Sequence, residues 1–294
     1  MGRTRKKYGG AFTANQLFEL FQAEYENREI KQSIKLDILA KDDKDLYNST
    51  VRVYFDPLKS RFIMVHRGTQ MDNLFDLTNN IRNIIAVKTK MLRTKRAERA
   101  ETGHKRLKEY LIQLYHRSNP STSNEQIIIK EIAKLKQVSD SQLLRISTED
   151  AVDELLKNKL STIGHSQGAI YAYTYGNQGK ETIVFNPAPY IGKKPDNIYI
   201  VRIKGDPISS ITTTGNSFLS LSPSKIQVLE RRKLDENDKG MITPHFITQL
   251  RGNAAIIGNK QVFTHDTQIK GRSDKKIHNS QGGSKRKTQK RKST

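Results

Sequence analysis

One five-residue turn limits the folds open to this 294-residue chain more than any other feature. Residues Gly164–Gly168 read Gly-His-Ser-Gln-Gly. They stand between a run that suits a strand, Leu160–Ile163, and a run that suits a buried helix, Ala169–Tyr173. A strand that passes directly into a helix brings the two backbones together, and glycines two residues on either side of a serine relieve the crowding. The pattern therefore predicts a sharp strand–turn–helix unit with Ser166 at its apex.

The pentapeptide is informative because of its neighbours. By composition alone it arises by chance in roughly one chain of this length in ten, and a purely structural glycine turn is the alternative interpretation. In a strand–turn–helix setting, the serine hydroxyl lies at the edge of a sheet and the next backbone N–H points into the same space. We therefore expect Ser166 to be an exposed nucleophile.

Strand-like and helix-like segments alternate over most of the chain. Apolar, β-branched runs bounded by turn residues predict strands, and apolar residues at helical spacing predict helices. This alternation predicts an α/β fold with a mostly parallel central sheet and helices on both faces. The predicted strands are Val51–Phe55, Arg61–His66, Leu160–Gly164, Thr182–Phe185 and Asn197–Ile203, and the predicted helices are Ala14–Tyr25 capped by Thr13, Asp76–Val87, Gly103–Arg117, Gln126–Val138 and Thr148–Leu155.

The formal net charge of +22 is concentrated in three segments. The first ten residues carry four Lys or Arg and no acid, residues 88–108 carry nine against two acids, and residues 270–294 carry ten against one. We expect all three to lie outside the packed core of a domain over residues 11–255. Residues 1–10 form a basic extension, and residues 256–294 form a basic, largely disordered tail. The basic segments are candidate contacts for an anionic membrane surface, and the tail is a candidate contact for nucleic acid.

Several classes of protein are disfavoured by what the sequence lacks. The chain has no cysteine, which excludes a disulfide framework and a zinc site with thiolate ligands. The basic start is not followed by an apolar segment, and no apolar run approaches the roughly 18 residues that a membrane span needs. We therefore expect an intracellular protein without a transmembrane segment, in a compartment that the sequence leaves open.

A nucleophilic serine requires an acid and a base, which in folds of this kind follow it along the chain. Asp206 follows the last predicted strand, at the edge where open α/β sheets place their sites, whereas Asp196 precedes that strand. Only His245, His265 and His278 come after Asp206. His245 directly precedes an apolar run that suits a packed helix. We therefore predict His245 as the base and Asp206 as the acid, with His265 as the alternative base.

Several motifs, taken in order, resemble the class 3 lipases, which are fungal-lipase-like α/β hydrolases. The likeness covers roughly residues 50–250. The resemblance implies an α/β-hydrolase fold and a serine carboxylic-ester hydrolase that acts on lipids, of the lipase or phospholipase A1 type. The matching segments are His66–Thr69 after an early strand, Asp76-Leu77, Thr162–Gly168 around the serine, Val184–Pro189 after the next strand, and Ile200–Pro207 around the acid.

The same resemblance assigns roles to individual residues. It implies a Ser–His–Asp triad, an oxyanion hole of two backbone N–H groups and a nucleophile elbow between glycines. Such chemistry is two-step acyl transfer on a lipid or other acyl ester, and it requires no metal and no cofactor. The residues are Ser166, His245 and Asp206 for the triad, Thr69 and Gln167 for the oxyanion hole, and Gly164 and Gly168 for the elbow.

The sequence also departs from this family. The family usually has Leu after the serine and a further Gly after the pentapeptide, where this chain has Gln167 and Ala169, and the aromatic residue common before the arginine is His66 here. The basic tail and the overall composition resemble proteins of large DNA viruses. Two alternative functions remain open. One is a non-catalytic binder of anionic surfaces or nucleic acid on a hydrolase fold, and the other is a thioesterase or peptidase on the same fold.

Deleting Gly271–Thr294 should weaken binding of the chain to anionic vesicles or to nucleic acid. Each Lys or Arg near an anionic membrane contributes about 1 kcal/mol before screening. Salt should weaken the binding further, because the Debye length falls to about 3 Å at 1 M. Vesicle co-sedimentation at low and high salt measures both effects. Unchanged binding by the truncated chain would leave the tail without this role.

Overall fold

The structure is a computed structural model, and it describes residues 12–68, 95–117, 119–140, 146–188, 196–206, 226–231, 247–251 and 256–257. All of them belong to one compact unit, Met1–Thr264. Its centre is a seven-stranded sheet with the strand order β2 (Asp37–Ile38), β3 (Val51–Asp56), β4 (Arg61–His66), β5 (Leu160–His165), β6 (Glu181–Phe185), β7 (Ile198–Ile203) and β8 (Ile226–Leu229). The strands from β2 to β4 pair antiparallel, and those from β4 to β8 pair parallel.

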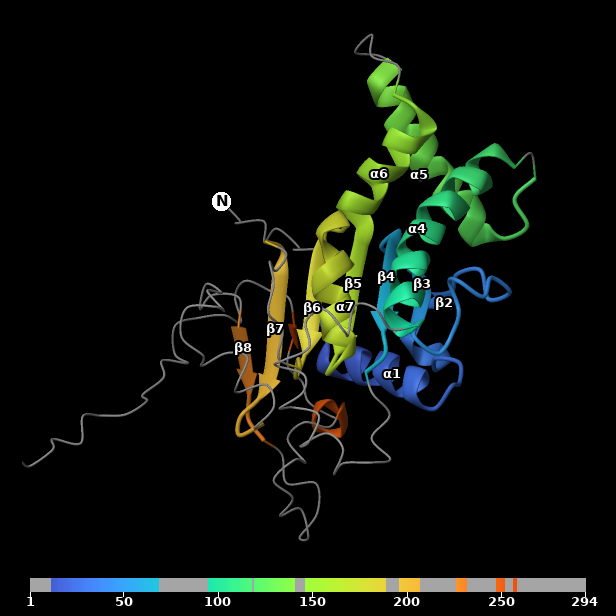
Figure 1. Cartoon of the computed structure of the whole chain (residues 1–294). Helices are drawn as coiled ribbons and strands as arrows, with labels where there is room; N and C mark the ends of the chain where they lie inside the picture. The colour runs from blue at the N-terminus through green and yellow to red at the C-terminus, as the bar shows by residue number, and fades with distance from the viewer. Residues whose placement is uncertain are drawn as a thin grey trace, which may run out of the picture. The chain divides into compact units, whose positions relative to one another are not determined.

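Helices cover both faces of this sheet (Figure 1). The helices are α1 (Ala14–Tyr25) on one face, and α4 (Lys95–His116), α6 (Thr148–Lys159) and α7 (Gly168–Tyr175) on the other, with α5 (Ser123–Asp140) packed on α4 and α6. Strand side chains alternate between the faces. In β4, Val65 joins the apolar cluster around α1, whereas Met64 joins the cluster around α4 and α6. The expected α/β fold, with a mostly parallel sheet between layers of helices, is confirmed.

Short elements complete the described part. Three short 3-10 helices are η1 (Gln32–Ile34), η2 (Gly176–Gln178) and η5 (Ile247–Leu250). A separate antiparallel pair joins β1 (Phe12–Thr13) to β9 (Ile256–Ile257). Ile257 is buried, so the packed part of the chain includes the first two residues of the range expected as tail. None of the helices in these segments contains the long apolar stretch that crossing a bilayer requires.

Local sequence signals located most of these elements. Every predicted strand matches an observed one to within one residue at each end. Thr13 caps α1 as predicted: its Oγ1 accepts from the Gln16 N–H (3.1 Å), and Gln16 Oε1 accepts from the Thr13 N–H (3.0 Å). The predicted helix Asp76–Val87 lies outside the described residues.

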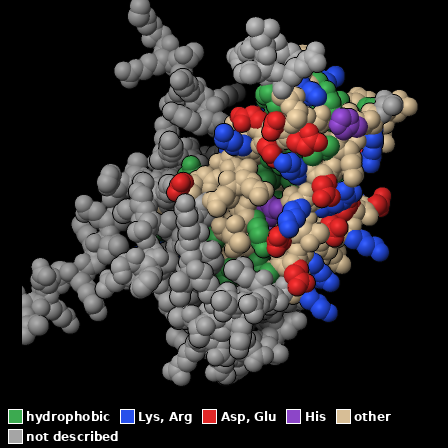
Figure 2. Space-filling model, turned by 45° about the horizontal axis from the view of Figure 1, so that its top comes forward, with side chains coloured by type: hydrophobic (Ala, Val, Ile, Leu, Met, Phe, Trp, Pro, Cys, Tyr) green, Lys and Arg blue, Asp and Glu red, His purple; other side chains and the backbone are tan. Residues whose placement is uncertain are grey.

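The basic stretch over residues 88–108 is part of the packed domain where the structure describes it. From Lys95 onward it forms the first half of α4, and its small residues Ala97 and Ala100 are buried against α7. The expectation of a segment outside the core is therefore wrong for these residues, because a charge count ignores the helical period that sorts small residues from charged ones. Figure 2 shows Lys and Arg interspersed with Asp and Glu over the visible part of the described surface. Ion pairs join Lys105 to Glu101, Arg106 to Asp43 and Lys108 to Asp153.

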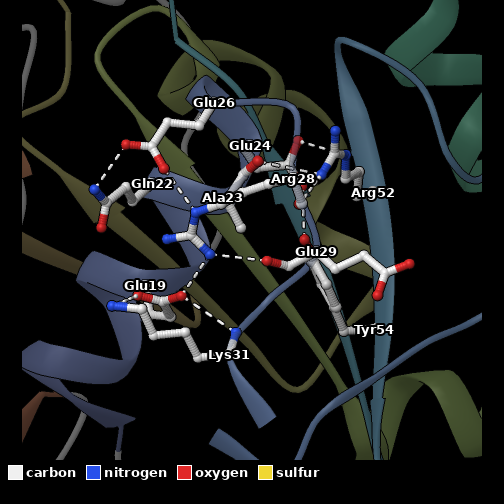
Figure 3. A network of polar contacts seen from close by, with 10 residues as sticks. All are labelled: Glu19, Gln22, Ala23, Glu24, Glu26, Arg28, Glu29, Lys31, Arg52 and Tyr54. Atoms are coloured by element: carbon white, nitrogen blue, oxygen red, sulfur yellow. Dashed lines mark hydrogen bonds and ion pairs between the residues drawn. The ribbon is translucent and has the colours of Figure 1, made fainter.

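A buried polar network joins the end of α1 to β3 (Figure 3). Arg52, which is 1 % exposed, donates through Nη1 to the carbonyl oxygens of Ala23 (3.2 Å) and Arg28 (2.9 Å). Its Nε lies 3.4 Å from Glu24 Oε2, and the Tyr54 hydroxyl donates to Glu24 Oε1 (3.1 Å). Leaving a buried polar group without its hydrogen-bond partner costs about 1–3 kcal/mol. The network therefore holds the end of α1 in one place on the sheet.

The contribution of Glu24 to the free energy of unfolding should fall as the pH rises from about 4.5 to about 8. Burial raises the pKa of Glu24 from its ordinary 4.5 to about 8, although Arg52 and Tyr54 favour the carboxylate. Between these pH values the folded chain keeps a proton that the unfolded chain has lost. The contribution of Glu24 to stability is therefore full below pH 4.5 and lost as the pH passes 8.

Urea unfolding of the wild type and of Glu24→Gln across this pH range measures the effect. The stability of the wild type relative to the variant should fall by at most about 1.4 kcal/mol per pH unit, because one proton is involved. Parallel stability curves would show instead that Glu24 stays ionised beside Arg52 throughout.

Candidate active site

Ser166 occupies the turn between β5 and α7. Its backbone is left-handed, with φ at 52°, a conformation that residues other than glycine rarely adopt. Its N–H donates to the Phe185 carbonyl oxygen at the end of β6 (3.2 Å), and its own carbonyl oxygen accepts from the Ala169 N–H in the first turn of α7 (3.1 Å). The predicted strand–turn–helix unit is therefore present, with the serine at its apex.

Two glycines permit this turn, because the backbone segments around it lie closer than any side chain allows. A Cβ added at Gly164 would lie 2.5 Å from the Gly168 carbonyl oxygen. One added at Gly168 would lie 2.2 Å from the carbonyl oxygen of His66, the last residue of β4. Both obstacles are backbone atoms, which have no rotamer to change. The start of α7 thus touches the backbone of two strands directly.

Three neighbouring strands leave the sheet at this edge through left-handed residues. Ser166 follows β5, Asn186 (φ 40°) follows β6, and Gly205 (φ 82°) lies two residues beyond β7. Asn186 also extends the ladder between β6 and β7, since its N–H donates to the Val201 carbonyl oxygen (2.8 Å) and its Oδ1 accepts from the Ile203 N–H (2.9 Å). The carboxyl edge of the sheet is therefore a row of sharp turns.

Asp206 follows the Gly205 turn and is fully buried. Its N–H donates to the Ile203 carbonyl oxygen (3.1 Å), which closes the turn. Because β6 lies between β5 and β7, Ser166 and Asp206 follow strands that are about 10 Å apart. Burial lowers the pKa of Arg202, and the charge of Asp206 opposes that shift, so the acid has a cation nearby.

On the α1 side, Tyr25 contacts the residue that precedes the serine. Tyr25 Oη lies 2.7 Å from His165 Nδ1, and it also accepts the Gly68 N–H. A Cβ added at Gly68 would lie 2.2 Å from Tyr25 Oη and 3.2 Å from Ser166 Cβ, so the chain after β4 passes directly beside the serine. In the sequence, Tyr25 is only the last residue of a predicted helix. No local signal reveals a contact across 140 sequence positions.

On the α4 side, Arg96 contacts the residue that follows the serine. Its Nη1 donates to Gln167 Oε1 (3.1 Å), and its Nη2 donates to the carbonyl oxygens of Arg67 (2.6 Å) and Gly68 (2.9 Å). In the sequence, Arg96 is one of nine Lys or Arg residues in the basic stretch 88–108, and its spacing does not indicate these contacts. The two residues that flank Ser166 are thus tied to helices on opposite faces of the sheet.

His66 and His104 form a buried pair beside this arrangement. Their Nε2 atoms lie 3.1 Å apart, their rings are stacked, and Tyr171 and Tyr175 pack against them. Burial lowers the pKa of His104 to about 3 and that of His66 well below its ordinary value. Both rings are therefore neutral near pH 7 and pack as core residues. Elsewhere in the described segments, no three His, Asp or Glu side chains are placed together to hold a metal ion.

Two of the predicted site residues, Thr69 and His245, lie outside the described residues. Their nearest described neighbours in sequence are close to this edge. Gly68 lies beside Ser166. The short helix η5 begins two residues after His245 and packs on α1, within the cluster that includes the last residues of β6 and β7.

Ser166 is buried, with 4 % of its surface exposed, so the expectation of an exposed serine is wrong. The turn has the predicted form, but residues from neighbouring loops pack around it. Gly68 lies on one side, and the Ala188 N–H donates to the Ser166 carbonyl oxygen (3.0 Å). The sequence pattern describes the backbone of the turn and carries no information about loops that other strands contribute at the same edge.

Comparison of the chain with protein-family models, with curated proteins and with solved structures found no match. The interpretation of this edge therefore depends on its own geometry and chemistry. That geometry comprises a strained serine, a buried acid two strands away, and two chain segments anchored on either side of the serine. These are components that acyl transfer by a nucleophilic serine requires.

Gly168→Ala should destabilise the fold far more than Gly205→Ala. At Gly168 the new methyl group would meet backbone atoms at 2.2 Å, whereas at Gly205 nothing lies within 4 Å and only the positive φ is strained. We expect about 1–2 kcal/mol for Gly205→Ala and more than about 3 kcal/mol for Gly168→Ala. Urea unfolding of both variants makes the comparison. Equal losses would mean that α7 does not need its close approach to β4.

Proposed function

We propose that the chain is a serine carboxylic-ester hydrolase that acts on lipid acyl esters, of the lipase or phospholipase A1 type, with Ser166 as its nucleophile. The observation that carries the proposal is the left-handed backbone of Ser166 between β5 and α7. This conformation costs roughly 1–2 kcal/mol in a residue other than glycine. Strained residues of this kind cluster at active sites, because the surrounding structure must hold them in place.

In the proposed reaction, Ser166 Oγ attacks the ester carbonyl while His245 takes its proton and Asp206 orients His245. The backbone N–H groups of Thr69 and Gln167 stabilise the oxyanion, and the N-terminus of α7 adds the positive end of its dipole. His245 then protonates the leaving alcohol, and water hydrolyses the acyl-enzyme with the same base. The burial of Asp206 supports its role, because the attraction between its carboxylate and an imidazolium is stronger where water does not screen it.

The strand arrangement supports an α/β-hydrolase fold. The serine follows one parallel strand, a second parallel strand intervenes, and the acid follows the third. Open α/β sheets bind their ligands at this carboxyl edge. The lipid substrate is inferred from the resemblance to class 3 lipases, whose matching segments fall at the turns after β5 and β7. A thioesterase or a peptidase would share these turns, so a substrate series must decide among them.

Fluorophosphonate labelling with mass mapping tests the nucleophile. Wild-type protein should be labelled at Ser166 and should hydrolyse p-nitrophenyl esters, with rates that rise with acyl chain length if the substrate is a lipid. Ser166→Ala should lose labelling and about 10⁶ in turnover. Ser33→Ala, at an exposed serine in η1, is the matched control and should change neither. Full activity in Ser166→Ala would refute the proposal.

The same assay tests the partners of the serine. Asp206→Asn should lower turnover by roughly 10⁴, because the histidine then adopts the wrong tautomer. His245→Ala should be about as damaging as Ser166→Ala. Activity lost in His265→Ala and kept in His245→Ala would assign the base to His265 and leave the rest of the triad in place.

A further inference from the structure

Arg96 joins two chain segments that flank Ser166 without belonging to the triad. It is the second residue of α4, and its side chain is half-buried. One guanidinium nitrogen reaches Gln167 Oε1, in the residue after the serine. The other reaches the carbonyl oxygens of Arg67 and Gly68, in the segment that passes beside it. A single side chain thus links residues that are about 100 positions apart in the sequence.

The partners of Arg96 are neutral oxygens. The charged or ionisable groups that influence the pKa of Arg96 are Tyr171, Tyr25, Arg67 and Arg99. Among the described residues, none of these groups is a carboxylate. An arginine placed for an ion pair would face a carboxylate. This one uses the rigid fork of its guanidinium to hold two carbonyl groups and one amide at fixed positions, which a lysine ammonium on a flexible stem does less well.

Holding the Gly68 carbonyl has a consequence for the next peptide N–H. The carbonyl and the N–H of one peptide unit lie in a plane and point in opposite directions. A guanidinium that holds the Gly68 oxygen therefore restrains the whole peptide unit to which that oxygen and the next N–H belong. That N–H belongs to Thr69, which is one of the two oxyanion donors of the proposed reaction.

The contact with Gln167 accounts for a departure from the class 3 lipase pattern. The family usually has Leu after the serine, and a leucine side chain cannot accept a hydrogen bond. In this chain Gln167 Oε1 accepts from Arg96 Nη1 at 3.1 Å. Having Gln at this position, and not Leu, is therefore what allows Arg96 to bind the residue after the serine. Gln167 also carries the second proposed oxyanion donor on its backbone.

We propose that Arg96 is a positioning residue that sets the geometry of the oxyanion hole, through the Gly68 carbonyl on one side of Ser166 and the Gln167 side chain on the other. This inference rests on the proposed hydrolase function. Oxyanion donors act only if they are fixed where the negative charge develops, so their misplacement lowers the rate of the chemical step and leaves the binding of a small ester largely unchanged.

The test measures kcat and KM on a soluble short-chain p-nitrophenyl ester, with active sites counted by fluorophosphonate labelling taken to completion. Counting active sites removes any misfolded fraction from kcat. Arg96→Met should lower kcat per labelled site by about 100-fold with little change in KM, which is the size of effect seen when one oxyanion donor is lost. Arg96→Lys, which retains the charge and loses the fork, should recover part of that loss.

Two further variants sharpen the experiment. Arg99→Met removes an exposed cation from the same helix and should behave as wild type. Gln167→Leu should give a smaller loss than Arg96→Met, because the Gly68 contact remains, and the two losses should not add in the double variant. If Arg96→Met does not fold, Arg96→Lys and Gln167→Leu decide the matter, and wild-type kcat in both overturns the inference.

The experiment also separates this inference from the proposed function. A wild-type chain that is neither labelled at Ser166 nor active on any ester would refute the hydrolase proposal itself. A wild-type chain that is labelled and active, together with an Arg96→Met variant that keeps wild-type kcat per labelled site, would overturn the role of Arg96 alone.

Discussion

The close approach of α7 to the backbone of β4 is the constraint on which the rest of this structure depends. Gly168 lies where even a Cβ would meet the carbonyl oxygen of His66. This contact fixes where α7 begins, and the chain must reverse at Ser166 with a left-handed backbone to reach it. The strain is about 1–2 kcal/mol. Burying one large apolar side chain contributes about 1.5–3 kcal/mol, and every residue from Gly168 to Tyr173 is buried, so the packing of α7 outweighs the strain.

The two helical layers hold this turn from opposite sides, and both use polar contacts for the purpose. On one face, the pair of Arg52 and Glu24 fixes the end of α1, from which Tyr25 reaches His165. On the other face, Arg96 reaches from α4 to Gln167. Buried or half-buried polar groups add little net stability, but any displaced arrangement leaves a charge or a carbonyl without its partner. Apolar clusters therefore supply the stability, whereas polar contacts supply the position of the serine.

Much of the fold follows from signals that are local in sequence. The cap at Thr13, the alternation of β4 and the glycines around Ser166 each depend on residues within a few positions of one another. The surroundings of the site do not. Tyr25 meets His165, and His66 stacks on His104, through contacts that only the assembled sheet creates. Arg96 shows the same limit, since a count of charges cannot separate a cation that faces solvent from one that holds a loop.

The proline that follows Asn186 closes the main route by which this asparagine could deamidate. The side chain of Asn186 joins the ends of β6 and β7, because its Oδ1 accepts a hydrogen bond from the Ile203 N–H. Asparagine deamidates mainly when the backbone nitrogen of the next residue attacks the side-chain carbonyl. Here the next residue is Pro187, whose nitrogen carries no hydrogen, and this route is closed. With any residue other than proline at position 187 this route would be open, and its product would place a buried carboxylate where a neutral amide now accepts from the Ile203 N–H.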